Sequence, residues 1–308
     1  MNSQDEPSAT ALPPSALARD PAEVKSAFRP QREILRRFTK QPLGMIGLVI
    51  FTALLLVAAI GPTIAPENPY ELGVAGRLRP PSAANLAGTD HLGRDVLSRV
   101  MYGVRPSLVV ALGAVIVSIT VGTVVGGVSA LAGGKVDLVV QRIMDAISTL
   151  PSLFLGILVL TILSPTYATL MFAIGIVTVP TVQRVVRAST LAEKERDYIL
   201  ACEVVGATQT RVLAQHILPN ISSSILVIAS AELGSAILIA ASLSFLGFGT
   251  PPPEPSLGAM ISSEGRQFMV EAPWLVLVPA TLVSLAILSA NFIGDALRDT
   301  LDPRLFVK

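Results

Sequence analysis

Cysteine and histidine are nearly missing from this 308-residue chain, which has one cysteine, Cys202, and two histidines, His91 and His216. A single cysteine cannot form an internal disulfide, and the three side chains lack the spacing of a metal-ligand motif. Both histidines fall in segments that connect long apolar runs, so no Ser–His dyad is buried in a membrane. We therefore expect no catalytic residue and no metal site, and an intramembrane enzyme is the least favoured function.

Charged residues are also scarce: they make up 15% of the chain, against 51% hydrophobic residues, and the mean hydropathy is +0.64. This composition argues against a soluble protein and favours an integral membrane protein. Lys and Arg crowd into a few connecting segments, so we expect no basic face for DNA or RNA. No GxxxxGK[ST] loop occurs, so the chain cannot bind nucleotide phosphates as a P-loop does, and any ATP must be used by a partner.

Six apolar runs are each long enough for the ~20 residues that cross a ~30 Å hydrocarbon core. They predict an all-α membrane protein with six transmembrane helices. The third run has a polar first half, with Asp137, Gln141, Arg142 and Asp145, which must face other helices rather than lipid. The expected spans are 43–65, 106–132, 138–163, 167–189, 221–246 and 273–296.

The N-terminal part is different in character. Residues 1–22 are rich in Pro, Ser and Ala, which predicts disorder. Residues 23–40 are basic and partly amphipathic, typical of a helix at an anionic membrane surface or of a solvated helical arm. We expect a tail over 1–40 and one transmembrane domain over 41–308, whose first span is an uncleaved anchor. Most Lys and Arg fall on the side of the N-terminus, which predicts that both termini are cytoplasmic.

One charged segment, "RDYILACEVVGATQTRVLAQHILPN" at 196–220, separates the fourth and fifth spans. Apolar residues from Ile199 to Val205 have near-helical spacing, and Gly206 then suits a left-handed residue just past a helix end. Thr208 can cap a second short helix, which Pro219 stops. That helix either presents its apolar face to a protein partner or rests it on its own bundle. The face consists of Val212, Leu213, Ile217 and Leu218.

Two acidic residues, Asp145 and Glu232, lie well inside apolar spans. A charge at a helix centre costs about 2.5–3.5 kcal/mol unless it faces the protein interior, a cavity or a partner. Both are therefore candidate pathway-lining or helix-pairing residues. Outside the second span, a motif of turn formers and both charge signs favours local ion pairing. This motif consists of Gly88, Thr89, Asp90, Gly93, Arg94 and Asp95.

The segment at 196–219 resembles the cytoplasmic signature loop of type I ATP-binding-cassette importer permeases, a Glu-Ala-Ala, then Gly, then Ile-x-Leu-Pro pattern. Leu200 stands where the family usually has Glu, and Cys202 replaces the second Ala. In relatives a Glu often precedes the "ASLSFLG" run, where this chain has Ala240, eight residues after Glu232. The resemblance implies an ATPase-coupling loop that contains Ala201, Cys202, Glu203, Gly206, Ala207, Ile217, Leu218 and Pro219.

Three further stretches narrow the resemblance: "GTDHLGRDVLSRVMYGVRPSL" at 88–108, "LSFLGFGTPPPEPSLGAMI" at 243–261 and "NFIGDALRDTLDPRL" at 291–305. They are similar to the second permease subunit of dipeptide, oligopeptide and nickel importers, over roughly residues 40–306. The resemblance implies the type I importer permease fold, a position near the gate for the motif at 88–95, and a multi-pass protein of the cell (inner or plasma) membrane. It also implies four partners: a homologous second permease, two ATPase subunits that bind ATP and Mg, and an extracytoplasmic binding protein.

The expected function is therefore half of a translocation pathway that imports di- or oligopeptides by ATP-driven alternating access. No cofactor is bound by this chain itself. Nickel, glutathione or another small solute is the alternative cargo, because the motifs mark the permease and not what it carries. A stand-alone secondary transporter or channel is the alternative from a different class, and it should work without any ATPase.

Overall fold

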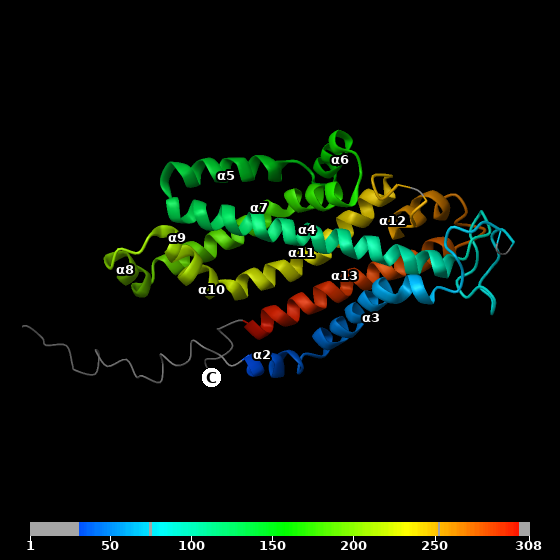
Figure 1. Cartoon of the computed structure of the whole chain (residues 1–308), viewed down its shortest axis with the longest axis horizontal. Coiled ribbons are helices and arrows are strands. Elements are labelled where there is room, and N and C mark those ends of the chain that lie inside the picture. The colour runs from blue at the N-terminus through cyan, green and yellow to red at the C-terminus, as the bar shows by residue number, and fades with distance from the viewer. Residues whose placement is uncertain (1–30, 74–75, 252, 302–308) are drawn as a thin grey trace, which may run out of the picture.

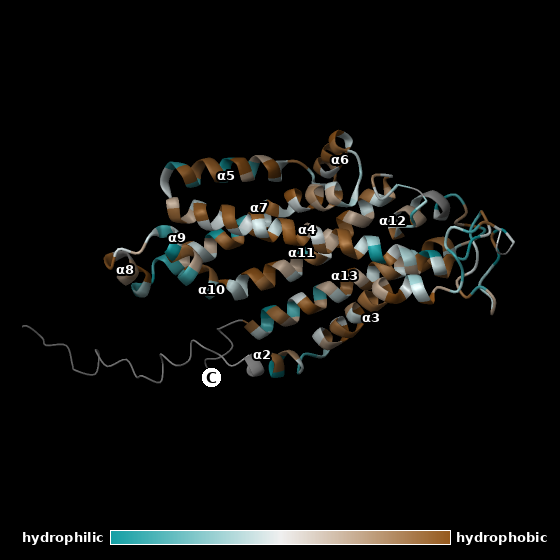
Figure 2. Ribbon diagram, viewed as in Figure 1, coloured by the Kyte–Doolittle hydropathy of each residue, from teal (hydrophilic) through white to brown (hydrophobic). Residues whose placement is uncertain are grey.

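The computed structural model describes residues 31–73, 76–251 and 253–301. The disorder predicted for residues 1–22 falls outside them. Five long helices lie along the long axis of the molecule (Figure 1), and each is long and apolar enough to cross a membrane. Figure 2 shows that apolar residues cover the middle of this bundle, whereas hydrophilic residues gather toward its two ends. The five helices are α3 (Pro42–Ile64), α4 (Val96–Ala132), α7 (Tyr167–Lys194), α11 (Ser222–Phe245) and α13 (Trp274–Leu301).

The remaining helices of the described residues are short. They are α2 (Gln31–Phe38), α5 (Gly134–Thr149), α6 (Ser152–Leu163), α8 (Asp197–Val204), α9 (Gln209–Arg211), η3 (Val212–Ile217, a π-helix), α10 (Leu218–Asn220), α12 (Leu257–Ala259) and η4 (Met260–Gly265, a π-helix). The fold class predicted from the sequence, an all-α membrane protein, is confirmed, because within the described ranges the only β-type pairing is one isolated bridge between Thr89 and Asp95.

The third span is broken, and the continuous helix predicted over 138–163 is wrong. Helices α5 and α6 meet at an angle of 93°, and together they count as one span only if the bent pair is taken as a unit. Leu150 and Pro151 between them are extended, with ψ angles of 139° and 132°. Proline forces the residue before it out of the helical region, so a helix ends there. Hydropathy alone cannot show this bend, because both halves are apolar.

The second span begins earlier than predicted. Helix α4 starts at Val96 rather than at residue 106, because Asp95 caps it by accepting a hydrogen bond from the Ser98 backbone N–H at 2.8 Å. Pro106 lies inside the helix without ending it. The extra turns lie outside the apolar run, so they extend the helix beyond the predicted span toward the segment 66–95.

The most extensive helix contact is between α4 and α7, which pack along much of their length. A Cβ atom on Gly126 would lie 2.7 Å from the Gln183 carbonyl oxygen, and one on Gly175 would lie 3.0 Å from the Ala114 carbonyl oxygen. Glycine therefore lets the two backbones touch, as small residues do between membrane helices. The other long helices pack around this pair, and most of their buried apolar residues form one large cluster.

Replacing Gly126 by valine should separate α4 from α7, because the new side chain meets backbone rather than a side chain that could move. We expect a cost of about 1–3 kcal/mol, as for overpacked cores. Val124→Leu is the control, since Val124 is 58% exposed on the same helix. The measurement is the thermal unfolding midpoint in detergent micelles. Equal midpoints for the two variants would contradict the close packing of α4 on α7.

Candidate functional site

Polar sites lie at both ends of the bundle. The segment 196–220, with α8 and α9, lies at one end, and the loop over 66–95 lies at the other (Figure 1). Residues predicted as functional lie at both ends, and the acidic residues Asp145 and Glu232 lie between them. The predicted coupling residues at 201–219 and the motif at 88–95 are therefore far apart.

Helix α8 ends as predicted. Gly206 has a φ angle of +85°, and the Ala207 N–H donates to the Cys202 carbonyl at 3.0 Å, which is the long hydrogen bond of a Schellman motif. No atom lies within 4 Å of the place that a Gly206 side chain would take. Glycine is required here by the left-handed backbone and not by crowding.

The second helical unit of the segment runs through α9, η3 and α10 without a break, from Gln209 to Asn220. One predicted detail is wrong: Thr208 has the extended backbone of a cap residue, but its side chain makes no capping hydrogen bond. The unit ends at Asn220, one residue past Pro219, which was predicted to stop it.

A small buried cluster holds this segment on the bundle. Ile199 and Ile217 are fully buried, and Val212 is 1% exposed. They pack with Val182 and Val186 of α7. The apolar face of the second helix therefore rests on the chain's own bundle, which is one of the two outcomes that the pattern left open. The cluster also contains Leu131 and Ile221, with Cys202, Ala207, Leu213 and Leu218 partly buried against it.

Polar contacts reinforce the cluster. Tyr198 donates a hydrogen bond to Glu193 and accepts one from the Asn220 side chain at 2.8 Å, so both ends of the segment are tied to each other and to the end of α7. Burial, and then the hydrogen bond to Glu193, raises the pKa of Tyr198 to about 12. Lys194 donates to the Leu131 carbonyl at 3.1 Å and ties α7 to the end of α4.

The tip of α8 points away from the bundle and is apolar. Val204 and Val205 are each 87% exposed, and Leu200 is 51% exposed. Ala201 is exposed beside them, whereas the side chain of Glu203 lies outside what the structure describes. These valines lie beyond the apolar spans, so their side chains are exposed to water rather than to lipid. A partner protein that covered them would remove apolar surface from water.

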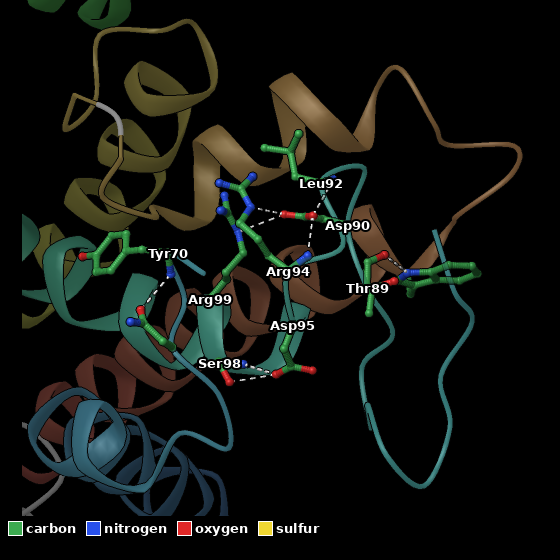
Figure 3. A network of polar contacts seen from close by, with 10 residues as sticks. Tyr70, Thr89, Asp90, Leu92, Arg94, Asp95, Ser98 and Arg99 are labelled. Atoms are coloured by element: carbon green, nitrogen blue, oxygen red, sulfur yellow. Dashed lines mark hydrogen bonds and ion pairs between the residues drawn. The ribbon is translucent and has the colours of Figure 1, made fainter. Parts of the chain in front are cut away.

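Figure 3 shows the motif at the opposite end, where Asp90 is fully buried. Its carboxylate accepts hydrogen bonds from the backbone N–H groups of Leu92 and Arg94 at 2.8 and 2.9 Å. It also accepts one from Nε of Arg94 at 2.6 Å, and Nε of Arg99 lies 3.6 Å away. One buried carboxylate thus organises the buried guanidinium group of Arg99 and the partly buried one of Arg94, which fits the local ion pairing expected from the sequence.

The neighbouring residues fasten the motif to the bundle. Asp95 accepts from Ser98 Oγ at 2.8 Å and from Asn85 Nδ2 at 3.0 Å, besides capping α4. Thr89 donates to the Gly76 carbonyl at 2.6 Å, and its own carbonyl accepts from the Trp274 indole at 3.2 Å. The loop is therefore tied to both α4 and α13. Gly88 and Gly93 have φ angles of +74° and +75°, which glycine adopts without strain.

The two acidic residues inside the spans have different surroundings. Glu232 is 7% exposed and lies on the face of α11 that buries Ala236 and Ala240, so it faces the bundle. Asp145 is exposed in the chain alone and pairs with Arg184 of α7, with 3.2 Å between Nη2 and Oδ1. It therefore faces another helix, as the polar half of the third span was expected to do.

Sequence reasoning missed the basic partners of the third span. Asp137 accepts two hydrogen bonds from Arg187, one of them from Nε at 2.7 Å, and Asp145 pairs with Arg184. Both arginines lie in α7: Arg187 is 50 positions along the chain from Asp137, and Arg184 is 39 positions from Asp145. Opposite charges in two apolar runs suggest pairing, but the register between the helices cannot be read from the sequence. The two pairs fix α5 alongside α7.

A bundle of five apolar helices plus a broken one, with a helical segment projecting from one end, defines a helical integral membrane protein. The model of the family "Binding-protein-dependent transport system inner membrane component" matches residues 118–307, and that of the "N-terminal TM domain of oligopeptide transport permease C" matches residues 30–81. The chain belongs to the first of these families, as a multi-pass protein of the inner membrane.

Named relatives agree with this assignment. A dipeptide transport system permease protein of Alkalihalophilus pseudofirmus is 37% identical over 294 residues, which cover 96% of each chain. Its counterpart in Haemophilus influenzae is 38% identical over 90% of this chain and 95% of its own. A glutathione transport system permease protein of Pectobacterium atrosepticum is 37% identical over 91% and 93%. The family resemblance found in the sequence is confirmed: the chain is a type I importer permease, similar to the second permease subunit of dipeptide and oligopeptide importers.

Asp90→Asn should destabilise the motif at 88–95, because the amide keeps the shape of the carboxylate but leaves the guanidinium groups of Arg94 and Arg99 without its negative charge. Breaking a buried ion pair costs about 3–5 kcal/mol. Glu71→Gln is the control, since Glu71 is an exposed carboxylate in the same loop. Thermal unfolding in detergent compares them, and an Asp90→Asn midpoint equal to that of Glu71→Gln would refute the structural role of the carboxylate.

Proposed function

We propose that this chain is one of two permease subunits of an ATP-driven, binding-protein-dependent importer of short peptides, and that it forms half of the translocation pathway. Its partners are then a homologous second permease, two ATPase subunits that hold ATP and Mg, and an extracytoplasmic binding protein. The names of its relatives, which include dipeptide and glutathione permeases, support a peptide cargo. Glutathione is itself a short peptide, so the names point to one chemical class.

The observation that carries the proposal is the exposed apolar tip of α8 on a rigid base. Leu200, Val204 and Val205 project from the bundle, while Ile199 and Ile217 are buried beneath them. A partner that covered the tip would gain the free energy of removing apolar surface from water. Because the base is packed, a push on the tip moves α7 and α11 with it, as rigid-body transitions require. This supports the role of residues 201–207 and 217–219 as an ATPase-coupling loop.

The orientation follows from charge. The distribution of Lys and Arg puts the N-terminus, the segment 196–220 and the C-terminus in the cytoplasm. Helix α2 and the end of α13 lie toward the α8 end of the bundle in Figure 1, in agreement with this orientation. The motif at 88–95 then lies on the extracytoplasmic side, where a binding protein docks.

Within the span region, Asp145 and Glu232 act in this proposal as helix-pairing residues. The ion pair between Asp145 and Arg184 holds the broken third span to α7, and such a pair of exposed groups is weak enough to exchange during a conformational change. Glu232 faces the bundle from the middle of α11. Alternating access would shift the helices on which these residues lie.

Reconstitution in liposomes tests the function. Proteoliposomes with this chain, the second permease, both ATPases and the binding protein should accumulate a labelled dipeptide only when ATP is present on the ATPase side. The chain alone should carry no flux, because it has no nucleotide-binding loop and no pathway of its own. Dipeptide flux through the purified chain without ATPase or ATP would instead identify a channel or secondary carrier.

Gly206→Val should abolish transport and uncouple ATP hydrolysis while the protein still inserts into the membrane. A β-branched residue cannot adopt a φ of +85° without a strain of about 1–2 kcal/mol or more, so the turn between α8 and α9 will change shape. Thr208→Val is the matched control, because the backbone there is extended and accepts valine. Uptake and ATPase rates are measured at equal membrane levels. Wild-type uptake by Gly206→Val would show that coupling does not depend on this turn.

A further inference from the structure

Tyrosine is rare in this chain, which has four, yet three of them line a single cavity. The cavity has a volume of about 420 Å³ and lies at the end of the bundle opposite α8, where α3, α4 and α7 meet the segment after α11. Tyr70 comes from the loop over 66–95, Tyr102 from α4 and Tyr167 from the start of α7. Three separate parts of the chain thus place an aromatic ring in the same cavity.

Two of the rings are held in place by contacts that the structure describes. The Tyr70 and Tyr102 rings lie edge to face, with centroids 6.2 Å apart and an interplanar angle of 76°. The Tyr102 hydroxyl donates to the Pro62 carbonyl at 3.0 Å. Proline residues 106 and 255 form further parts of the wall. The cavity is therefore preformed, which lowers the entropic cost of binding a ligand.

The cavity carries one charge of each sign. Glu254 accepts a hydrogen bond from the Tyr167 hydroxyl at 2.7 Å, and within the described ranges this is the only hydrogen bond to its carboxylate. Burial, and then the charge of Glu254, raises the pKa of Tyr70. Arg105 of α4 lines the cavity as well and is exposed to it.

These groups match the chemistry of one kind of ligand. A carboxylate beside tyrosine rings attracts a primary ammonium group by ion pairing and by cation–π attraction. A guanidinium group binds a carboxylate or a peptide carbonyl. Small-molecule sites have volumes of about 300–1,000 Å³, so the cavity accommodates a small ligand. A short peptide with a free N-terminus carries both an ammonium group and carbonyl or carboxylate oxygens.

We infer that this cavity is a binding subsite for the N-terminal ammonium group of a short peptide. Glu254 and the rings of Tyr70, Tyr102 and Tyr167 would contact the ammonium group. Arg105 would bind the carbonyl or carboxylate oxygens of the peptide. The inference rests on the proposed function and adds to it a recognition element within the permease. Peptides would occupy the subsite on the extracytoplasmic side, before they pass through the bundle.

Protection of a single thiol tests the subsite directly. Cys202 is the only cysteine, so Val109→Cys in a Cys202→Ser background puts one reactive thiol on the cavity wall. The assembled transporter, in nanodiscs and without binding protein, is labelled with a membrane-impermeant maleimide. The probes are alanyl-alanine and its N-acetylated form. Alanyl-alanine should slow labelling, and the N-acetyl form should require about tenfold higher concentration, as for the loss of a charged hydrogen bond.

Matched variants identify the carboxylate. Glu254→Gln in the same background should weaken protection by alanyl-alanine about tenfold and leave protection by the N-acetyl form unchanged. Glu71 is an exposed carboxylate at the same end of the bundle, so Glu71→Gln should change protection by neither peptide. Leu72→Cys, at a side chain 65% exposed outside the cavity, should be labelled at the same rate with and without peptide. If Glu254→Gln does not assemble, Tyr167→Phe replaces it, since it removes the hydrogen bond that orients Glu254 and should weaken protection selectively for the free ammonium form.

Three results would overturn the inference: equal protection by both probes, no protection by either at millimolar concentration, or protection that Glu254→Gln and Glu71→Gln affect alike. Dipeptide uptake by the wild-type transporter is measured in parallel. Uptake without thiol protection rejects the subsite and leaves the proposed function standing. No ATP-dependent uptake by the complete wild-type transporter rejects the proposed function itself.

Discussion

Helices α4 and α7 approach so closely that the backbone of Gly126 lies against that of α7, and the other parts of the molecule are attached to this pair. The buried cluster under the segment 196–220 packs on Val182 and Val186 of α7. The loop at the opposite end is fastened to the start of α4 through Asp95 and its hydrogen bonds. A displacement at one end can therefore reach the other through two helices in direct contact, without a flexible connection between them.

Hydropathy predicted the first span well and the third poorly, because the third is not a single helix. The first predicted span, 43–65, differs by one residue at each end from the helix Pro42–Ile64. The prediction of the third span failed because the length of an apolar run shows how much hydrocarbon it can cross, but not whether the chain bends within it. Its break at Leu150–Pro151 does have a local signal, since proline prevents the residue before it from being helical.

The candidate site was predictable in its local chemistry and not in its long-range contacts. The left-handed Gly206 follows from a pattern of five or six residues, and so does the pairing of Asp90 with neighbouring arginines. The partners of Asp137 and Asp145 depend on how α5 lies against α7, which no local pattern contains. The apolar face of residues 212–218 could be recognised from the spacing of its residues. Whether it contacts a partner or the chain's own bundle is decided by tertiary packing, here with Ile199 and Val182.

The bend between α5 and α6 also bears on how the protein matures in the membrane. Residues 149–152 at the bend are exposed in the chain alone, and non-helical backbone at membrane depth is tolerated only against protein or water, because each unsatisfied group costs several kcal/mol in hydrocarbon. Among the described residues the bend is left uncovered, so its backbone needs water or a neighbouring protein. In the proposed assembly the second permease would supply that cover, and the lifetime of a newly inserted copy in the bilayer would depend on how soon the two subunits meet.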